Sequence, residues 1–120
     1  MPPHISEKHM KAIQKINLVL LILISLGAGA AKLLQEPTEM QYFMDAGIGL
    51  NALLLLGGVQ ILAGILLIFH NVRRRGAVVA VVTFLVSTII IFINGQITFG
   101  AFSLLPILMA GYVIAGEDII

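Results

Sequence analysis

One lysine stands out as the residue of this chain that can do chemistry inside an apolar segment. Lys32 follows the small-residue run 27–31 and precedes Pro37, which a helix interior does not tolerate. Near the end of a membrane helix, a lysine either extends its ammonium group to the lipid headgroups or turns it inward to a carboxylate. Glu36, one helical turn further on, and Asp45 are the two carboxylates that we consider as inward partners.

Two carboxamides supply the next candidate polar groups, Gln60 and Asn94. Gln60 lies with Gly57 and Gly64 at i, i+3 and i+7, so the glycines allow a neighbouring backbone to approach it. Polar side chains of a membrane helix face other helices or water. Lys32, Gln60 and Asn94 are therefore the candidate ligand-binding residues, and Gln60 is also interpreted as a hydrogen-bonding link between helices.

Hydroxyl groups occupy the same helix face as Asn94, at Thr83 and Ser87. In a helix, such hydroxyls usually bond to carbonyl groups of their own preceding turn. We expect both of them to do so here, with Ser25 on the face of the first apolar run that also carries Lys32. The three side chains are thus interpreted as lining the interior without forming a catalytic group.

Several kinds of site are excluded by composition. The chain has no cysteine, which removes disulfides and thiolate metal sites. A haem with two histidine ligands needs paired histidines inside the membrane, and His70 is the one that comes near. We expect no metal site. No residue set demands a cofactor or catalytic activity of the chain on its own, and the sequence does not decide whether it is an enzyme.

The composition is that of an integral membrane protein. Of the 120 residues, 59% are hydrophobic and 11% are charged, whereas a soluble domain carries roughly 25% charged residues. A spanning helix needs about 20 apolar residues, so the length allows four spans and no soluble domain. The fold class expected for residues 1–120 is one all-α domain, a bundle of four transmembrane helices. The predicted spans are residues 12–34, 48–69, 77–93 and 97–115.

The segments between the spans carry recognisable signals. Thr38 followed by Gln41 resembles a capping box and predicts a short amphipathic helix over 39–46 at the membrane surface. Residues 73–76 and 94–96 are interpreted as turns. Within the fourth span, Pro106 predicts a kink.

Basic residues predict the orientation. Lys8, Lys11 and Lys15 precede the first span and Arg73–Arg75 lie between the second and third, so four alternating spans place both groups on one side. The positive-inside rule makes that side cytoplasmic. We therefore expect a multi-pass protein of the cytoplasmic (inner or plasma) membrane with both termini in the cytoplasm.

Two stretches resemble the DoxX-like family of small four-helix membrane proteins. They are 29–33 (Gly-Ala-Ala-Lys-Leu), followed by a loop with Tyr42-Phe43 and Gly47, and the second-span run 57–64 before the basic turn. Members often carry Glu where this chain has Gln60. The resemblance implies a four-helix bundle in the cytoplasmic membrane, and its members include redox-associated subunits and proteins that assist assembly.

Two functional hypotheses remain open from the sequence. The first is a non-catalytic accessory or assembly subunit, whose partners are the lipid bilayer and other membrane subunits or a second copy of the chain. The second is a redox-associated subunit that binds a quinone or lipid-like ligand near Lys32, Gln60 and Asn94, because a quinone needs few donors in an apolar cleft. Neither hypothesis includes nucleic acid as a partner.

Overall fold

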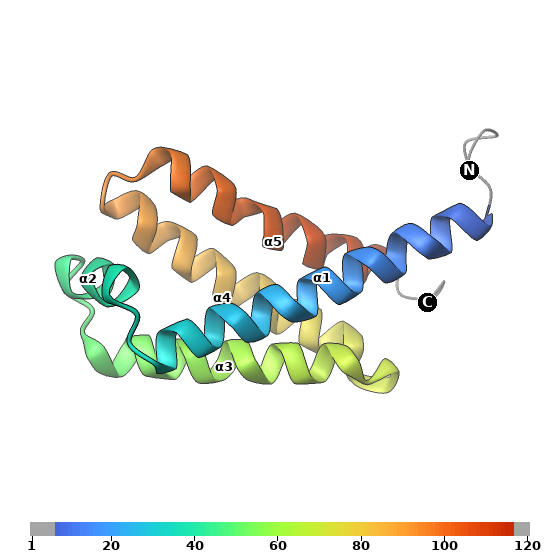
Figure 1. Cartoon of the computed structure of the whole chain (residues 1–120), viewed down its shortest axis with the longest axis horizontal. Coiled ribbons are helices and arrows are strands. Elements are labelled where there is room, and N and C mark those ends of the chain that lie inside the picture. The colour runs from blue at the N-terminus through green and yellow to red at the C-terminus, as the bar shows by residue number, and fades with distance from the viewer. Residues whose placement is uncertain (1–6, 117–120) are drawn as a thin grey trace.

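The computed structural model describes residues 7–116, and these residues are almost entirely helical (Figure 1). No strand occurs among the described residues. The helices are α1 (Glu7–Leu33), α2 (Pro37–Asp45), α3 (Leu50–Ile68), the 3-10 turn η1 (His70–Val72), α4 (Arg73–Ile93) and α5 (Ile97–Gly116). By length and composition, α1, α3, α4 and α5 can each cross a membrane, and α2 lies between the first two spans. The predicted fold class is confirmed.

The four long helices form a bundle in which neighbours in sequence mostly pack together. Helix α3 packs against α1 and α4, and α4 packs against α5. At the end of the bundle where α1 begins and α5 ends, α1 also contacts α5 (Figure 1). There the Asn17 amide donates to the Met109 carbonyl oxygen at 3.1 Å, and the Gln14 amide donates to the Gly116 carbonyl oxygen at 3.4 Å. These two hydrogen bonds close the bundle between its first and last spans.

Glycines bring α1 and α3 close together. A Cβ atom added at Gly29 would lie 2.6 Å from the Gly57 carbonyl oxygen, and one added at Gly57 would lie 2.7 Å from the Lys32 Cβ. A Cβ at Gly64 would lie 2.7 Å from the side chain of Leu26. Close approach at small residues is the main way membrane helices gain packing contacts. The sequence prediction that glycines beside Gln60 admit a neighbouring backbone is confirmed.

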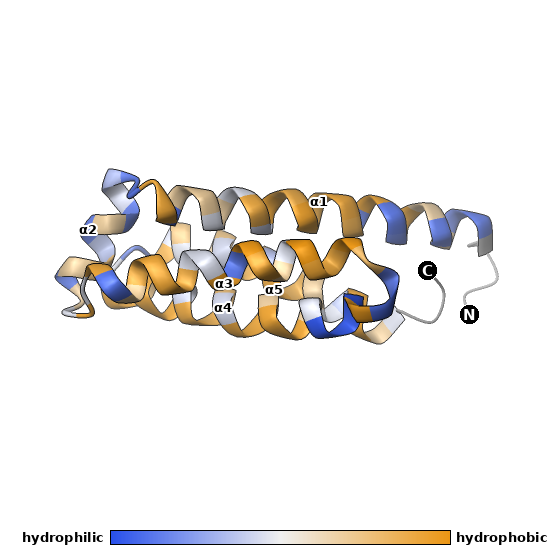
Figure 2. Cartoon of the chain, turned by 90° about the horizontal axis from the view of Figure 1, so that it is seen from below, coloured by the Kyte–Doolittle hydropathy of each residue, from blue (hydrophilic) through white to orange (hydrophobic). Residues whose placement is uncertain are grey.

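Two apolar clusters make up the interior, and the outer surface is apolar as well. The larger cluster joins all four long helices, and its buried members are Leu18, Leu21, Ala63, Leu67, Ala77, Ala80, Phe84, Ala110 and Val113. The smaller cluster lies beside α2 and consists of Phe43, Leu53 and Ile90. Figure 2 shows that the long helices consist mostly of hydrophobic residues and that hydrophilic residues gather at the bundle ends, and many large hydrophobic side chains are exposed. This distribution suits a bundle surrounded by hydrocarbon.

The start of α2 differs from the prediction. Helix α2 begins at Pro37, and the capping side chain is Glu36, whose carboxylate accepts the backbone N–H of Glu39 at 3.0 Å. Thr38 and Gln41 therefore form no capping box, and that expectation is wrong. The reason is that the fixed φ of proline suits the first helical position, so the helix begins there and the preceding residue becomes the cap.

The basic segment also differs from the prediction. Arg73 begins α4, and the turn is formed by η1 instead of by residues 73–76. The Arg73 guanidinium donates to the carbonyl oxygens of Leu67 at 2.9 Å and Ile68 at 3.2 Å. Those carbonyls belong to the last turn of α3 and have no partner within their own helix. The arginine therefore terminates one helix while it begins the next.

The remaining connections follow the sequence signals. Gly47, which follows α2, and Gly95, in the turn between α4 and α5, both have φ of +76°, a value that favours glycine. Pro106 is buried inside α5, which continues from Ile97 to Gly116. The kink expected at Pro106 stays a prediction. Helix α1 begins at Glu7, so it includes polar residues that precede the predicted span 12–34, and the lysines of its first turns are helix-compatible.

Candidate functional site

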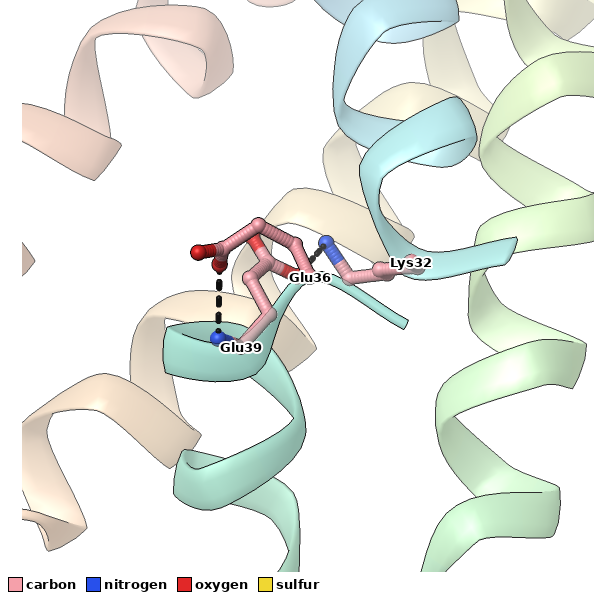
Figure 3. A network of polar contacts seen from close by, with 3 residues as sticks. All are labelled: Lys32, Glu36 and Glu39. Carbon is pink, nitrogen blue, oxygen red and sulfur yellow. Dashed lines mark hydrogen bonds and ion pairs between the residues drawn. The ribbon is translucent and has the colours of Figure 1, made fainter. Parts of the chain in front are cut away.

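Lys32 points into the protein and forms an ion pair. Its side chain is 2% exposed, and its Nζ lies 2.9 Å from a carboxylate oxygen of Glu39 (Figure 3). The lysine thus turns inward instead of extending toward the headgroups. The expected partners Glu36 and Asp45 are wrong, because within residues 7–116 the ion pair of Lys32 is with Glu39.

The geometry of α2 explains why Glu39 is the partner. Pro37 begins a new helix, which carries Glu39 in its first turn above the end of α1. Glu36 is engaged with the N-terminus of α2, where the backbone N–H groups of Glu39 and Thr38 hold the pKa of the Glu36 carboxyl below its ordinary value. Asp45 is exposed at the opposite end of α2. Glu39 combines a position near Lys32 with a side chain that is 22% exposed.

The ion pair leaves little free charge at this position. A buried ammonium needs a counter-ion, because an unpaired charge in a medium of low polarity is strongly unfavourable. The Lys32–Glu39 pair satisfies that need and connects the end of α1 to α2. Its direct chemical consequence is to hold α2 against the bundle.

Asn94 also holds α2. Its amide donates to the carbonyl oxygens of Tyr42 at 3.0 Å and of Ile90 at 2.9 Å. Tyr42 in turn contacts Phe99 of α5, with ring centroids 6.1 Å apart. The amide therefore connects α2 to the end of α4, and its two donor hydrogens have protein acceptors. This use differs from the predicted ligand-binding role of Asn94.

Gln60 is fully buried, and its amide is unsatisfied. Neither its Nε2 nor its Oε1 has a hydrogen-bond partner in the described part of the chain. The link between α1 and α3 is made instead by the Gln60 backbone, whose carbonyl oxygen accepts the Ser25 hydroxyl at 2.6 Å. The side chain is therefore not the expected link between helices. Buried amides without partners are rare, because leaving one unpaired costs about 1–3 kcal/mol.

The hydroxyl groups of α4 divide into two kinds. Thr83 donates to carbonyl oxygens of its own helix, at 3.0 Å for Val79 and 3.1 Å for Ala80, as predicted. Ser87 was expected to do the same, but its hydroxyl is buried without a partner among residues 7–116. Among residues 7–116, the buried polar atoms without a hydrogen-bond partner therefore include both amide atoms of Gln60 and the hydroxyl of Ser87, as well as the Oε1 of Gln14.

An apolar groove runs between α2, α3 and α4. It has a volume of about 270 Å³ and is lined by Phe43, Ile48, Ala52, Leu55, Leu56, Val59, Val86 and Ile90. Several of these residues face the surroundings, and Leu55 is 71% exposed. No sequence pattern predicts this groove. Its apolar lining residues come from three elements, and they meet only because those elements pack together.

Two of these unsatisfied groups, those of Gln60 and Ser87, belong to helices that form the groove. Gln60 directly follows Val59 on α3, and Ser87 directly follows Val86 on α4. Both are buried where the adjacent lining residues are partly exposed. They therefore lie on the interior side of the groove walls. Of the three predicted ligand-binding residues, Gln60 is the one associated with this groove, while Lys32 and Asn94 are engaged with α2.

Comparisons with known proteins do not add an identity. The chain matches no protein-family model, no curated protein and no solved structure. Within the described residues there is also no group of three or more His, Cys, Asp or Glu side chains that is placed to hold a metal ion.

Proposed function

We propose that this protein is a non-catalytic accessory or assembly subunit of a membrane complex, which binds a partner through the outward face of α5. One observation carries the proposal. Gly111 and Ala115 are four residues apart, both are exposed, and a Cβ added at Gly111 would have no neighbour within 4 Å. Pairs of small residues at this spacing allow close approach of another membrane helix.

The residues around Gly111 favour the same interpretation. Leu104 and Leu108 continue its face of α5 toward the opposite end of the helix, and Leu108 is 69% exposed. The face thus combines a small-residue contact point with large side chains that can pack on either side of it. Association of membrane helices depends on such packing, because lipid chains are as apolar as leucine.

Location and orientation are part of the proposal. The lysines of α1 and the arginines at the start of α4 lie at the end of the bundle opposite α2 (Figure 2). By the positive-inside rule, this end faces the cytoplasm, and α2 lies at the outer surface of the cytoplasmic membrane. The DoxX-like resemblance supports an accessory role in that membrane, as an analogy at the level of fold.

The experiment compares two glycines on different faces. Gly58 on α3 is also exposed and also has no neighbour within 4 Å of an added Cβ. Blue-native electrophoresis of mildly solubilised membranes should place the wild-type chain and Gly58→Leu in an assembly, and Gly111→Leu with the free chain. A wild-type chain that migrates alone, or equal migration of the two variants, contradicts the proposal.

A second candidate function is binding of a quinone or another lipid-like ligand in the groove between α2, α3 and α4. The observation that favours it is the buried amide of Gln60, which is unsatisfied on the interior side of an apolar wall. A quinone carbonyl is an acceptor for such an amide after a rotation of the side chain. Purified protein should bind a fluorescent or radiolabelled quinone analogue, and Gln60→Leu should lose that binding while Gly58→Leu retains it. Equal binding by both variants contradicts this assignment.

A further inference from the structure

Helix α2 supplies one wall of the apolar groove, at the end of the bundle opposite the start of α1 (Figure 1). Phe43 of α2 lines the groove and is 3% exposed, because it is buried in one cluster with Leu53 of α3 and Ile90 of α4. Ile48, which follows α2, is a further lining residue, and the rest of the lining belongs to α3 and α4. A helix of nine residues that is not a membrane span therefore completes the groove.

Two polar contacts hold α2 against the bundle, and they come from different spans. The Glu39 carboxylate lies 2.9 Å from the Nζ of Lys32 on α1 (Figure 3). Further along α2, the Tyr42 carbonyl oxygen accepts the amide of Asn94, at the end of α4, at 3.0 Å. A helix as short as α2 is not stable alone in water. Its position therefore depends on these two contacts and on the packing of Phe43.

The connections on both sides of α2 have the features of hinges. Gln35, which precedes the helix, has a φ of +57°, and Gly47 and Gly49, which follow it, have φ of +76° and +93°. A Cβ added at either glycine would have no neighbour within 4 Å, so no side chain packs against that side of the connection. The hinges of protein lids are a few loop residues that absorb a change in φ and ψ.

We propose that α2 is a lid, which turns about residues 35 and 47–49 and admits a lipid-like ligand to the groove from the membrane surface. The proposal rests on the second candidate function, in which such a ligand binds in this groove. Opening separates Phe43 from Leu53 and Ile90 and connects the groove to the headgroup layer. The contacts made by Lys32 and by Asn94 keep the lid closed.

The chemistry of these contacts suits a lid at the membrane surface. Glu39 is 22% exposed, so the ion pair with Lys32 lies close to the surroundings of the bundle. When α2 turns outward, water reaches both charges, and neither is left unpaired in apolar surroundings, where it would be strongly unfavourable. The hydrogen bond of Asn94 is exchanged for one to water in the same way, and the small net value of such a bond permits reversible opening.

The first test reads the lid without any ligand. The chain contains no cysteine, so a single introduced thiol is the only one present. Phe43→Cys places the thiol where closed α2 covers it, and Met44→Cys places it where the wild-type side chain is 56% exposed. Nanodiscs of phosphatidylcholine that hold either variant are treated with a charged maleimide, which the hydrocarbon excludes. Phe43→Cys should react more slowly than Met44→Cys. Adding Asn94→Ala should raise its rate about fivefold, the equivalent of one net hydrogen bond.

The matched control for Asn94→Ala is Asn51→Ala, which makes the same change on an exposed asparagine at the start of α3. It should leave the labelling rate of Phe43→Cys unchanged. Hydrogen exchange of the cysteine-free chain checks that Asn94→Ala loosens α2 and leaves the bundle intact. Amides of residues 40–46 should exchange faster, while those of 83–90 in α4 keep their rates. Equal labelling with the two alanine variants, or equal acceleration of exchange in α4, overturns the lid.

The second test measures how fast the quinone analogue enters and leaves the groove. A lid affects entry and exit alike, so Asn94→Ala should raise the association and dissociation rates together, each about fivefold, and leave Kd unchanged. A faster dissociation alone would mean that α2 is a fixed wall of the site, and rates equal to those of Asn51→Ala would mean that α2 does not control entry. Either result overturns the proposal. Absence of any binding contradicts the second candidate function instead, and the labelling rates then decide whether α2 opens.

Discussion

The Nζ of Lys32 lies 2.9 Å from a carboxylate oxygen of Glu39, and both side chains are mostly shielded from solvent. The pair joins the last turn of α1 to the first turn of α2. Asn94 holds the same short helix from the other side through the Tyr42 carbonyl oxygen. Helix α2 is therefore attached by polar contacts to two different spans, although its own sequence is too short to be stable alone.

Glu39→Gln is expected to destabilise the protein strongly. It leaves the Lys32 ammonium buried without a counter-charge, and breaking one side of a buried pair costs about 3–5 kcal/mol. Glu39 keeps some exposure, which places the expected cost near the lower end of that range. The free energy of unfolding in mixed micelles measures the effect.

Asp45→Asn is the control, because it makes the same chemical change on an exposed carboxylate of the same helix. It should leave stability close to that of the wild type. Lys32→Met combined with Glu39→Leu should recover much of the loss, since it replaces both charges with apolar groups. A Glu39→Gln effect no larger than that of Asp45→Asn would contradict the ion pair.

The fold was predictable because apolar length and glycine spacing act locally. Runs of about 20 apolar residues predict spans directly. The turn predicted over residues 94–96 is present, and its Gly95 has the positive φ that glycine favours. Helix starts were less accurate, since Glu36 and Arg73 cap helix ends through their side chains. Several side chains near each helix end could act as the cap. Which one does so depends on which backbone carbonyl or N–H group lies within hydrogen-bond distance of it in the folded protein.

The candidate site was predictable only in part. Lys32 and Gln60 were correctly recognised as unusual polar residues inside apolar segments, and both are buried. The predicted partners of Lys32, Glu36 and Asp45, were wrong because the sequence does not show which residue of the helix after Pro37 lies above the end of α1, and the structure places Glu39 there. The groove beside Val59 arises from packing among three elements, and no periodicity in one element specifies it.

Gly57→Ala is expected to destabilise the bundle, while Gly58→Ala is not. An added Cβ at Gly57 would lie 2.7 Å from the Lys32 Cβ and 2.9 Å from the Gly29 carbonyl oxygen, so α1 and α3 must move apart. Overpacking of this kind costs about 1–3 kcal/mol. At Gly58 an added Cβ would have no neighbour within 4 Å. Unfolding free energies of the two variants make the comparison, and equal values would contradict the close helix approach.

Acidification is expected to loosen the start of α2. The backbone N–H groups of Glu39 and Thr38 lower the pKa of the Glu36 carboxyl from its ordinary value of 4.5. A lowered pKa means that the charged cap stabilises the fold above the ordinary value and that this contribution is lost as the pH falls through the lowered pKa. The amide chemical shift of Glu39 should follow this titration in NMR spectra. In Glu36→Gln the shift should not titrate in that range, and a titration that persists would contradict the cap.

Gln60→Leu is expected to stabilise the protein, which is the opposite of the usual effect of a core substitution. Both amide atoms of Gln60 are buried without a partner, so an apolar side chain of similar length removes an unpaired group. The expected gain in unfolding free energy is about 1–3 kcal/mol. Ser25→Ala is the matched control on the facing helix. It removes the hydroxyl that donates to the Gln60 carbonyl oxygen at 2.6 Å and should cost about 0.6 kcal/mol.

The stability and the ligand binding of Gln60→Leu together decide what the amide does. A natural chain retains a buried unpaired amide at a cost in stability, and use of that amide by a ligand in the adjacent groove accounts for the cost. A Gln60→Leu variant that is more stable than the wild type and no longer binds the quinone analogue therefore supports the ligand site. A Gln60→Leu variant that is more stable but binds the analogue as the wild type does shows that the amide takes no part in recognition. A destabilised Gln60→Leu would mean that the amide has partners in the membrane, which contradicts its unsatisfied state.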